Sequence, residues 1–407
     1  MVAGLATVDA ITNPDHLFTN AGIQVILGKV VQADPVGKTL TLADGGRVPY
    51  DKLILGTGAS QTMLPLPGNN LKGVFTLRDA QDAINLRNFL ETARPQKSVF
   101  IGAGFINLEL ACLLLSTAPD RYQATVIEVL DHVLPLLLDR DMAAGVQDYL
   151  AEKGCRIQVG QKVVRILGSE GRVAGVELAS GDRLEADLVM VAVGATPNLE
   201  LARQLGLQLG KFGIRVNQFL ETSNPDILAG GDCVEKEHFI TKKPVPGQMR
   251  GPAVIQGRLA AKRLAGYAIE FPGVLNNTAV KLFDKYIASV GLTETAARQE
   301  GLAPISAAAT SRSKHGMIPG VKPWTLKLIF QQSDQRLIGG QLVSDSEAPV
   351  KEIDTINALI LGGKTVADLT QLMCAGNPDC SSEPSLEPIT LCAEQALQKL
   401  SRERRQK

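Results

Sequence analysis

The sequence predicts an α/β protein with more than one domain, and three features carry this prediction. The chain has 407 residues, of which 45% are hydrophobic, so it can bury more than one core. Residues 98–111 have the pattern of an apolar strand, a glycine turn and a helix. The segment 44–60 returns in altered form at 180–196. A duplicated unit of strands and helices favours a parallel α/β architecture.

The segment "SVFIGAGFINLELA", which starts at Ser98, has the pattern of a dinucleotide-binding turn. Gly102 permits a tight turn, and Gly104 lets backbone N–H groups approach a pyrophosphate at the positive end of the following helix. Asn107 stands where such a motif usually has its third glycine. We therefore expect the helix to shift slightly and nucleotide binding to weaken.

Glu128 ends the next predicted strand, in "ATVIEVLDHVLP". A carboxylate there can accept a hydrogen bond from a ribose 2′-hydroxyl and repels a 2′-phosphate, and no Arg follows before Arg140. The residue thus favours NADH over NADPH. The alternative is that Glu128 is a solvated strand end without a ligand.

The internal repeat extends from a Gly-Arg turn through an Asp and an apolar strand to a glycine, Gly58 in the first copy and Gly194 in the second. Chance similarity of two hairpins is the alternative, but an ungapped match favours duplication. Gly102 lies 92 residues before Gly194, so a matching glycine motif in the first copy would precede Met1. We expect the chain to begin inside a repeat, truncated at its N-terminus.

Composition excludes several classes of function. The 42 basic and 42 acidic residues cancel, which gives no indication of a nucleic-acid or membrane-surface partner. The N-terminus lacks the pattern of a signal peptide, and no apolar run is long enough to span a bilayer, so a cytoplasmic location is expected. Six cysteines without a CxxC pair and four scattered histidines indicate neither a disulfide framework nor a metal site.

With these motifs described, the chain resembles the pyridine nucleotide-disulfide oxidoreductases, in the branch of NADH oxidases, NADH peroxidases and coenzyme A disulfide reductases. The similar segments are "YDKLILGTGASQTMLPLPG", "GAGFINLELA", "VAVGATPN" and "TSNPDILAGGDCVE", within a match from about residue 20 to about residue 395. The resemblance implies two interleaved FAD/NAD(P)-binding Rossmann-like domains plus a C-terminal α+β interface (dimerisation) domain.

The resemblance also implies domain boundaries. The expected ranges are 1–76 for the first segment of the FAD-binding domain, 77–197 for the NAD-binding domain, 198–268 for the second FAD-binding segment and 273–395 for the interface domain. In the first range we expect strands at Val25, at Leu27 and in the hairpin that leads to Gly58. In the interface domain, Thr293 is expected to cap a helix that begins near Glu294.

Cofactor contacts follow from the same resemblance. Asp232 would accept hydrogen bonds from the ribityl hydroxyls of FAD, although an Asp in such a turn can be an ordinary Asx turn. Glu109 would face the nicotinamide, although an acidic residue near a helix N-terminus needs no function. The full expected set for FAD and NAD is Thr57, Gly58, Gly102, Gly104, Asn107, Glu109, Glu128, Gly194, Gly231, Asp232 and Ala253.

The resemblance fails at the redox cysteine, which the family carries on the helix of the first repeat, upstream of Met1 in this alignment. Cys112, Cys155 and Cys233 are better interpreted as buried structural thiols. Cys380, in "GNPDCSS", is a candidate to reach the flavin of a partner subunit. No catalytic residue is assigned.

The predicted function is an FAD-dependent oxidoreductase that passes hydride from NADH through flavin to a disulfide, a peroxide or oxygen. One alternative is an NADH-dependent reductase of a small electron-carrier protein. Another is a non-catalytic NAD-binding relative that lacks the ADP part of the flavin site. The expected partners are a small-molecule or protein electron acceptor and, through the C-terminal domain, a second copy of the chain.

Overall fold

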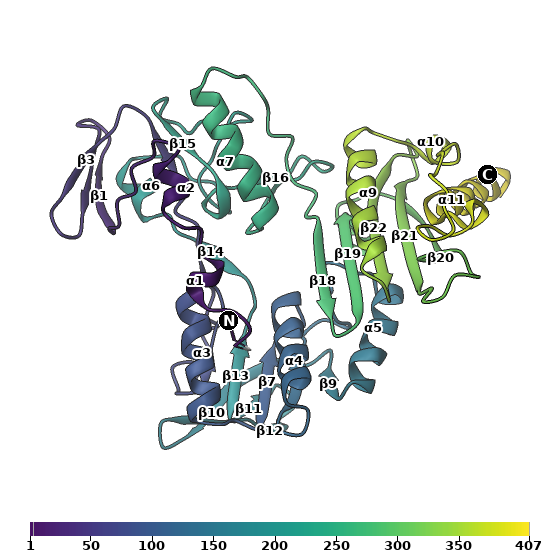
Figure 1. Cartoon of the computed structure of the whole chain (residues 1–407), viewed down its shortest axis with the longest axis horizontal. Coiled ribbons are helices and arrows are strands. Elements are labelled where there is room, and N and C mark those ends of the chain that lie inside the picture. The colour runs from purple at the N-terminus through teal and green to yellow at the C-terminus, as the bar shows by residue number, and fades with distance from the viewer. Residues whose placement is uncertain (3, 407) are drawn as a thin grey trace. The chain divides into compact units, whose positions relative to one another are not determined.

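The computed structural model describes residues 1–2 and 4–406 (Figure 1), and the chain forms two compact units. Unit 1 comprises Met1–Thr62, Arg78–Asn88 and Gly194–Val274, and unit 2 comprises Met63–Leu77, Phe89–Val193 and Leu275–Lys407. Each unit is assembled from separate stretches of chain, and both contain helices and strands. This confirms the predicted interleaved α/β architecture.

Unit 2 is built on a five-stranded parallel sheet in the order β6-β13-β7-β8-β9. Its strands are β6 (Val74–Phe75), β7 (Lys97–Ile101), β8 (Gln123–Ile127), β9 (Cys155–Gln158) and β13 (Leu188–Val191), with α4 (Phe105–Thr117) and α5 (Arg140–Glu152) in the connections. All four residues of β13 are buried, as expected of a central parallel strand covered on both faces. An antiparallel sheet of β10 (Val163–Ser169), β11 (Arg172–Leu178) and β12 (Arg183–Glu185) precedes β13.

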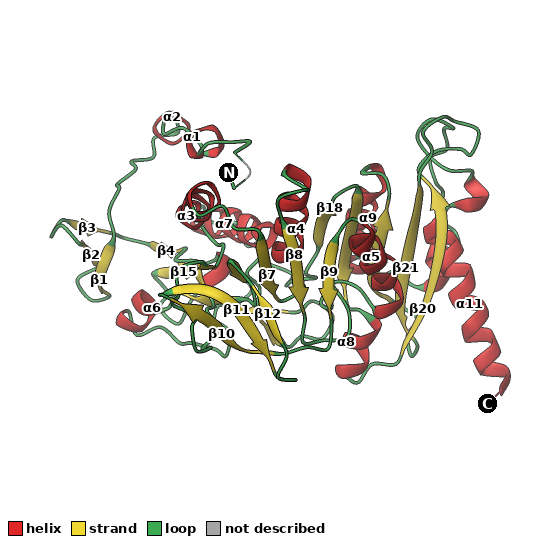
Figure 2. Cartoon of the chain, turned by 90° about the horizontal axis from the view of Figure 1, so that it is seen from below, coloured by secondary structure: helices red, strands yellow, loops and turns green. Residues whose placement is uncertain are grey.

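The C-terminal part of unit 2 is a five-stranded antiparallel sheet in the order β18-β19-β22-β21-β20 (Figure 2). Its strands are β18 (Thr278–Leu282), β19 (Lys285–Gly291), β20 (Pro304–Arg312), β21 (Pro323–Gln331) and β22 (Leu337–Ser344). The helices are α8 (Glu294–Gln299), α9 (Glu352–Leu361), α10 (Val366–Leu369) and α11 (Pro388–Gln406), with short 3-10 turns at Ala348–Lys351 and Pro384–Leu386. The Thr293 hydroxyl accepts from the N–H of Ala296 at 3.0 Å, which confirms the predicted cap of α8.

Unit 1 contains small sheets and one long helix. The sheets are β1 (Val30–Asp34), β2 (Thr39–Leu42) and β3 (Arg47–Pro49); β4 (Leu53–Leu55) with β15 (Ile227–Ala229); β5 (Ala59–Gln61) with β14 (Ala195–Pro197); and β16 (Lys236–Glu237) with β17 (Pro244–Val245). The helices are α1 (Val8–Ile11), α2 (His16–Thr19), α6 (Glu200–Gln204) and α7 (Arg250–Leu264), with a 3-10 turn at Gly231–Cys233; α3 (Ala80–Thr92) begins in this unit. None of the described helices is long and apolar enough to cross a membrane.

The two copies of the sequence repeat form equivalent elements. In the first copy, β3 closes an antiparallel three-stranded sheet and is followed by the parallel strand β4 and then by β5. In the second, β12 closes the same kind of sheet and is followed by the parallel strand β13 and then by β14. The last strands of the two copies, β5 and β14, pair with each other.

The predicted strands at Val25 and Leu27 are wrong, because the structure assigns neither residue to a strand. Their surfaces are 42% and 91% exposed. A strand is defined by its partners, and no described segment pairs with this one, so an apolar run alone did not suffice to make a strand.

Candidate functional site

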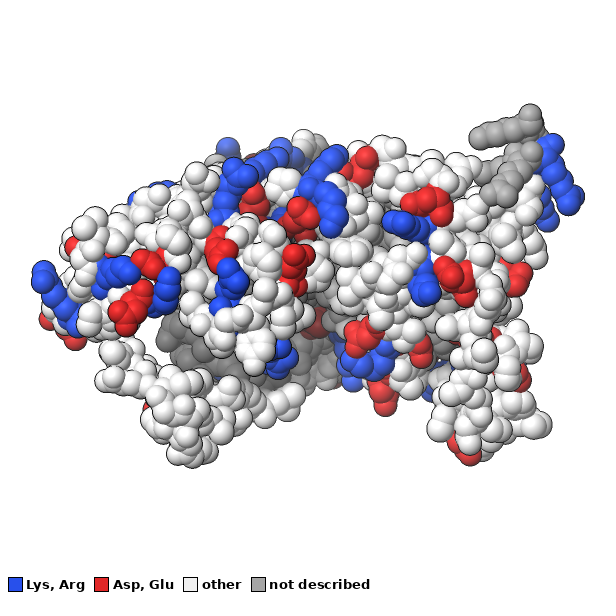
Figure 3. All heavy atoms as spheres, turned by 90° about the horizontal axis from the view of Figure 1, so that it is seen from above, with Lys and Arg blue, Asp and Glu red and all other residues white. Residues whose placement is uncertain are grey.

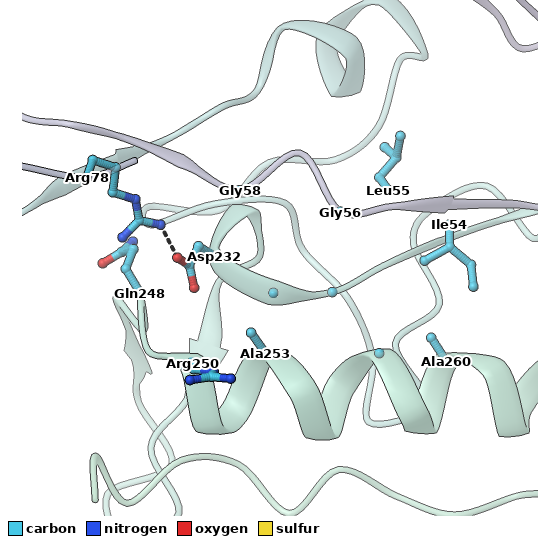
Figure 4. Close-up of a pocket in the computed structure, with 13 residues that line it drawn as sticks. Ile54, Leu55, Gly56, Gly58, Arg78, Asp232, Gln248, Arg250, Ala253 and Ala260 are labelled. Carbon is cyan, nitrogen blue, oxygen red and sulfur yellow. Dashed lines mark hydrogen bonds and ion pairs between the residues drawn. The ribbon is translucent and has the colours of Figure 1, made fainter. Parts of the chain in front are cut away.

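A cavity of about 530 Å³ lies in unit 1, where the end of β4, the start of α3, the Gly231–Cys233 turn and α7 meet (Figure 4). Its wall is made largely of glycine backbone and small side chains. The lining residues are Ile54, Leu55, Gly56, Gly58, Arg78, Gly230, Gly231, Asp232, Gln248, Arg250, Ala253, Gly257 and Ala260. The sequence analysis had assigned four of them to a cofactor: Gly58, Gly231, Asp232 and Ala253.

Asp232 is the acidic group of this cavity. Its Oδ2 forms an ion pair with Arg78, whose Nε also donates to the carbonyl of Ala59 at 3.2 Å (Figure 4). Its Oδ1 is buried and has no hydrogen-bond partner among the described residues. A buried acceptor without a donor is costly, so this oxygen suits a ligand hydroxyl, such as those of a ribityl chain.

Gly58 and Gly231 supply the backbone of the cavity wall. Both have positive φ, 66° and 80°, which side-chain-bearing residues rarely adopt. The N–H of Gly231 donates to Oε1 of Gln256 at 2.9 Å, and a Cβ at this glycine would lie 3.8 Å from that of Ala253. Ala253 is in the first turn of α7, so this turn borders the cavity, as do Gly257 and Ala260 farther along the helix (Figure 4).

Thr57 and Gly194 do not line the cavity. The Thr57 hydroxyl donates to the carbonyl of Asn198 at 2.8 Å, and the Asn198 amide donates back to the carbonyl of Thr57 at 2.9 Å. Gly194 accepts from the N–H of Thr62 at 3.1 Å. Both residues therefore brace the β5–β14 connection beside the cavity wall.

The predicted dinucleotide turn joins β7 to α4 in unit 2. Gly102 has φ of 98°, and a Cβ there would lie 3.1 Å from the carbonyl oxygen of Ala192. Gly104 is the N-cap of α4, whose 13 residues begin at Phe105. The first N–H groups of a helix have no partner within it, so this helix start can bind an anion.

Asn107, at the position of the third glycine, is packed into the turn. Its side chain is fully buried, and its Nδ2 donates to the carbonyls of Ile101 and Gly102 at 2.8 and 2.9 Å. The amide thus ties α4 to the end of β7. Its Oδ1 has no hydrogen-bond partner in the described part of the chain.

Glu128 lies directly beneath the same turn and is only 7% exposed. Its Oε2 accepts from the N–H of Ala103 at 2.7 Å, and its Oε1 accepts from the N–H of Leu130 at 2.9 Å. Glu128 is therefore not solvated at this strand end, and its contact with a ribose stays a prediction. A carboxylate has about four acceptor positions, so these two bonds leave capacity for a ribose hydroxyl.

Glu109 lies in the second turn of α4. Burial of the carboxyl raises its pKa, and the backbone N–H of Lys281 opposes this rise. The residue is in the same unit as the dinucleotide turn.

The cysteines divide into a buried and an exposed group. Cys112, Cys155, Cys233 and Cys392 are buried, whereas Cys374 and Cys380 are exposed. Burial raises the pKa of the thiols of Cys112, Cys155 and Cys392 to about 12. The thiolate is the reactive form, so these three are structural.

Sequence reasoning missed several residues around the cavity, above all Arg78, Arg250, Gln256 and Lys236. Arg78 follows an apolar segment in "TLRDAQDA", and no motif distinguished it from any surface arginine. Gln256 and Lys236 are buried polar residues, 1% and 2% exposed. For Gln256 the only available signal was a polar residue in an apolar stretch, and Lys236, between Glu235 and Glu237, offered no such signal.

Charged side chains are mixed on the molecular surface. On the face drawn in Figure 3, basic and acidic residues are interspersed. This agrees with the balanced composition of 42 basic and 42 acidic residues. Among the described residues, no group of His, Cys, Asp and Glu could hold a metal ion.

The described chain thus contains a glycine-lined cavity with an unpaired aspartate oxygen in unit 1 and a glycine turn next to a buried glutamate in unit 2. The model of the family "Pyridine nucleotide-disulphide oxidoreductase" matches residues 6–256, and that of its dimerisation domain matches residues 278–386. The chain belongs to this family, whose members use FAD and NAD(P)H, and it is an NAD(P)H-dependent flavoprotein oxidoreductase.

Relatives of known name support this assignment. The chain is 35% identical to an NADH oxidase of Methanocaldococcus jannaschii over 352 residues, which is 86% of this chain and 77% of the relative. It is 31% identical to a CoA-dependent NAD(P)H sulfur oxidoreductase of Pyrococcus abyssi, over 90% of this chain and 82% of the relative. The chain spans 77% and 82% of the lengths of these relatives, and the predicted N-terminal truncation stays a prediction.

Among solved structures, the chain is similar to an NAD-dependent persulfide reductase from A. fulgidus. The TM-score is 0.90 at 32% identity, with 98% of this chain and 75% of the other covered. The resemblance had indicated the branch of NADH oxidases, NADH peroxidases and coenzyme A disulfide reductases, and the comparisons confirm the NADH oxidase and CoA persulfide reductase branch.

Proposed function

We propose that this chain binds FAD in the unit 1 cavity and NADH at the unit 2 turn, and that it passes a hydride from NADH through the flavin to an acceptor. The observation that carries the proposal is the unpaired Oδ1 of Asp232 at the wall of a cavity built from two left-handed glycines and a helix start. The oxidase and persulfide reductase relatives support the same class of reaction.

Each residue of the cavity would have a defined part in holding the flavin, which itself supplies the ring that accepts the hydride. Gly58 and Gly231 let backbone approach the ligand without a Cβ in between. Asp232 accepts a ribityl hydroxyl through Oδ1 while Arg78 holds Oδ2. The start of α7, which carries Ala253, presents its positive end to an electron-rich edge of the ring.

The dinucleotide turn would hold NADH in preference to NADPH. The N–H groups at the start of α4 face the pyrophosphate, and the carboxylate of Glu128 accepts the ribose 2′-hydroxyl. A 2′-phosphate would meet that carboxylate as a like charge. Asn107 fixes the turn, and Glu109 lies farther along the same helix, where it would face the nicotinamide.

The acceptor would receive its electrons from the flavin without Cys112, Cys155 or Cys392 as relay. Three of the buried thiols have pKa values raised to about 12, which leaves almost no thiolate at neutral pH. A disulfide, a peroxide or oxygen is the acceptor of the main proposal.

A second candidate acceptor is a small electron-carrier protein. It is favoured by the same buried thiols and by 35% identity to a rhodocoxin reductase of Rhodococcus erythropolis over 269 residues, 64% of this chain and 60% of the relative. Under either candidate we propose that two copies of the chain associate through the C-terminal domain, residues 273–395, where the dimerisation-domain model matches.

The test is the visible absorption spectrum of the purified chain with added FAD, before and after anaerobic NADH. We expect the bands of bound oxidised flavin, which NADH bleaches. Asp232→Ala should lose the bound flavin, whereas the matched control Asp51→Ala, at an exposed carboxylate of the same unit, should retain it. A colourless chain that still binds NADH would contradict the proposal and favour a non-catalytic relative.

The acceptor is then identified by turnover. NADH consumption with oxygen, peroxide or a disulfide supports the main proposal. Rapid reduction of a rubredoxin-type or iron–sulfur carrier with slow turnover of all three small acceptors supports the second candidate instead.

A further inference from the structure

A buried lysine lies behind the wall of the cavity. Lys236, the first residue of β16, is 2% exposed, and its Nζ donates to the carbonyl of Gly231 at 2.6 Å. Its methylene chain passes over Gly247, where any side chain would collide with it. The packing therefore fixes the position of the ammonium group.

The bonded carbonyl belongs to the turn that forms the cavity wall. The N–H of Gly231 is held by Gln256, and its carbonyl is held by Lys236, so two buried side chains fix both polar groups of this residue. Gly230, Gly231 and Asp232 all line the cavity. Any change in the bond from Lys236 is thus passed directly to residues that would touch a ligand.

A buried ammonium is expensive unless it is paired. Burial lowers the pKa of Lys236 to about 8, and the nearby carboxylate of Asp232 and Cys233 oppose this shift. Two further charged groups line the cavity, namely Arg78, which pairs with Asp232, and Arg250 at the start of α7. An apolar residue at this position would pack without this cost, which indicates that the charge has a function.

We propose that Lys236 is a positioning residue of the flavin site: its ammonium holds the turn Gly230–Asp232 in the conformation that binds flavin and adds positive charge behind an anionic ligand. This inference rests on the proposed binding of FAD in the cavity. Loss of the ammonium proton replaces a charge-assisted hydrogen bond by a neutral one about half as strong and removes the charge. Flavin affinity should therefore fall as pH rises through the pKa of Lys236.

The experiment measures the dissociation constant of FAD by flavin fluorescence from pH 6.5 to 9.5, on the flavin-free full chain. For the wild type we expect affinity to weaken about tenfold between these limits. Lys236→Met should bind at the weak level at every pH, and Lys236→Arg should retain tight binding without the loss above pH 8. Lys242→Met removes an exposed lysine of the same hairpin and should match the wild type. Circular dichroism identifies any variant that fails to fold.

The outcomes separate the two proposals. FAD binding with a wild-type affinity that does not change with pH overturns the role of Lys236 and leaves the flavin site intact. The same pH profile in Lys236→Met as in the wild type also overturns it, because FAD and the other groups then account for the profile. Failure of the wild type to bind FAD at any pH overturns the proposed function, and this inference with it.

Discussion

At the scale of single residues, the buried polar groups make the sharpest predictions. Lys236 has a pKa of about 8 in the folded chain against 10.5 for an ordinary lysine. Between these values the unfolded chain binds more protons than the folded chain, so the free energy of unfolding rises with pH. Below pH 8 both states are charged, and the full cost of burying the ammonium remains.

The corresponding prediction compares urea unfolding of the wild type and Lys236→Met at several pH values. Relative to the variant, the wild type should gain about 3 kcal/mol of unfolding free energy from pH 7 to pH 10.5, the equivalent of its pKa shift. Loss of the hydrogen bond to Gly231 changes the unfolding free energy of the variant by the same amount at every pH. A difference in unfolding free energy between wild type and variant that does not change with pH would contradict a buried charge at Lys236.

Asn107 should matter for stability as well as for nucleotide binding. Asn107→Ala removes two hydrogen bonds of 2.8 and 2.9 Å and leaves buried carbonyls with fewer donors. We expect the unfolding free energy to fall by about 2 kcal/mol, measured by urea denaturation. Asn85→Ala, at an exposed position of α3, is the control and should change it by less than about 0.5 kcal/mol. Equal effects of the two substitutions would contradict the assigned role of Asn107.

The sequence predicted those site residues whose signal is local. Gly102, Gly104 and Glu128 belong to one strand–turn–helix–strand unit, so their spacing alone places them together. Arg78 and Lys236 meet Asp232 and its turn through the folded chain, and neither belongs to a motif. Only the structure could bring them to the cavity. The sequence did not predict that the side-chain amide of Asn107 donates hydrogen bonds to this turn.

At the scale of elements, a buried polar cluster joins four elements of unit 2. Asp139, the N-cap of α5, accepts from the N–H of Glu294 at 3.0 Å and from Gln341 of β22 at 2.7 Å. Lys327 of β21 lies 3.3 Å from Asp139 and donates to Asp141 at 2.8 Å. Asp139 and Lys327 are 4% and 3% exposed, so this cluster fixes α5 against α8 and the C-terminal sheet.

The pKa directions show how the cluster responds to pH. Burial acts to raise the pKa of Asp139, but the N–H of Glu294, Gln341 and Lys327 outweigh it, and the pKa is lowered from 3.8. The stability from a depressed carboxyl pKa is present above the unfolded pKa and is lost as pH falls through the folded pKa. The contribution of Asp139 should thus be complete above about pH 5 and be lost on acidification below about pH 4.

Asp139→Asn tests this cluster. The substitution keeps the shape of the side chain but removes a negative charge beside the buried ammonium of Lys327. We therefore expect the unfolding free energy at pH 7 to fall by about 3 kcal/mol. On acidification, the unfolding free energy of the variant should also fall by less than that of the wild type. Asp148→Asn, on the exposed side of α5, is the control. If both variants unfold alike at pH 7 and pH 4, the cluster does not stabilise unit 2.

Element assignments from sequence succeeded where apolar pattern and neighbours agreed. The repeat 44–60 and 180–196 predicted equivalent strands, because each copy carries its own turn, strand and glycine. The run around Val25 has the same apolar character, yet it lacks a pairing partner in the described chain. Strand formation depends on such partners more than on intrinsic preference.

At the scale of the whole molecule, the two proposed sites belong to different units, so their ligands should protect different stretches of chain. FAD should slow amide hydrogen exchange in unit 1, at 53–58, 227–232 and 250–257. NADH should slow it in unit 2, at 101–105 and 128–130. A ligand at one hundred times its dissociation constant adds about 2.7 kcal/mol to the free energy of unfolding of the unit that binds it. Amide exchange that requires unfolding of that unit therefore slows about a hundredfold.

Variants assign these effects to their sites. Asp232→Ala should abolish the protection by FAD and leave that by NADH, because Asp232 belongs to unit 1 and the dinucleotide turn to unit 2.

NADPH in place of NADH should protect the unit 2 segments only at concentrations at least about tenfold higher, since the 2′-phosphate would approach the carboxylate of Glu128. Equal protection by the two dinucleotides would contradict the assignment of Glu128. Protection of the unit 2 turn by FAD alone would contradict the division of the two nucleotides between the units.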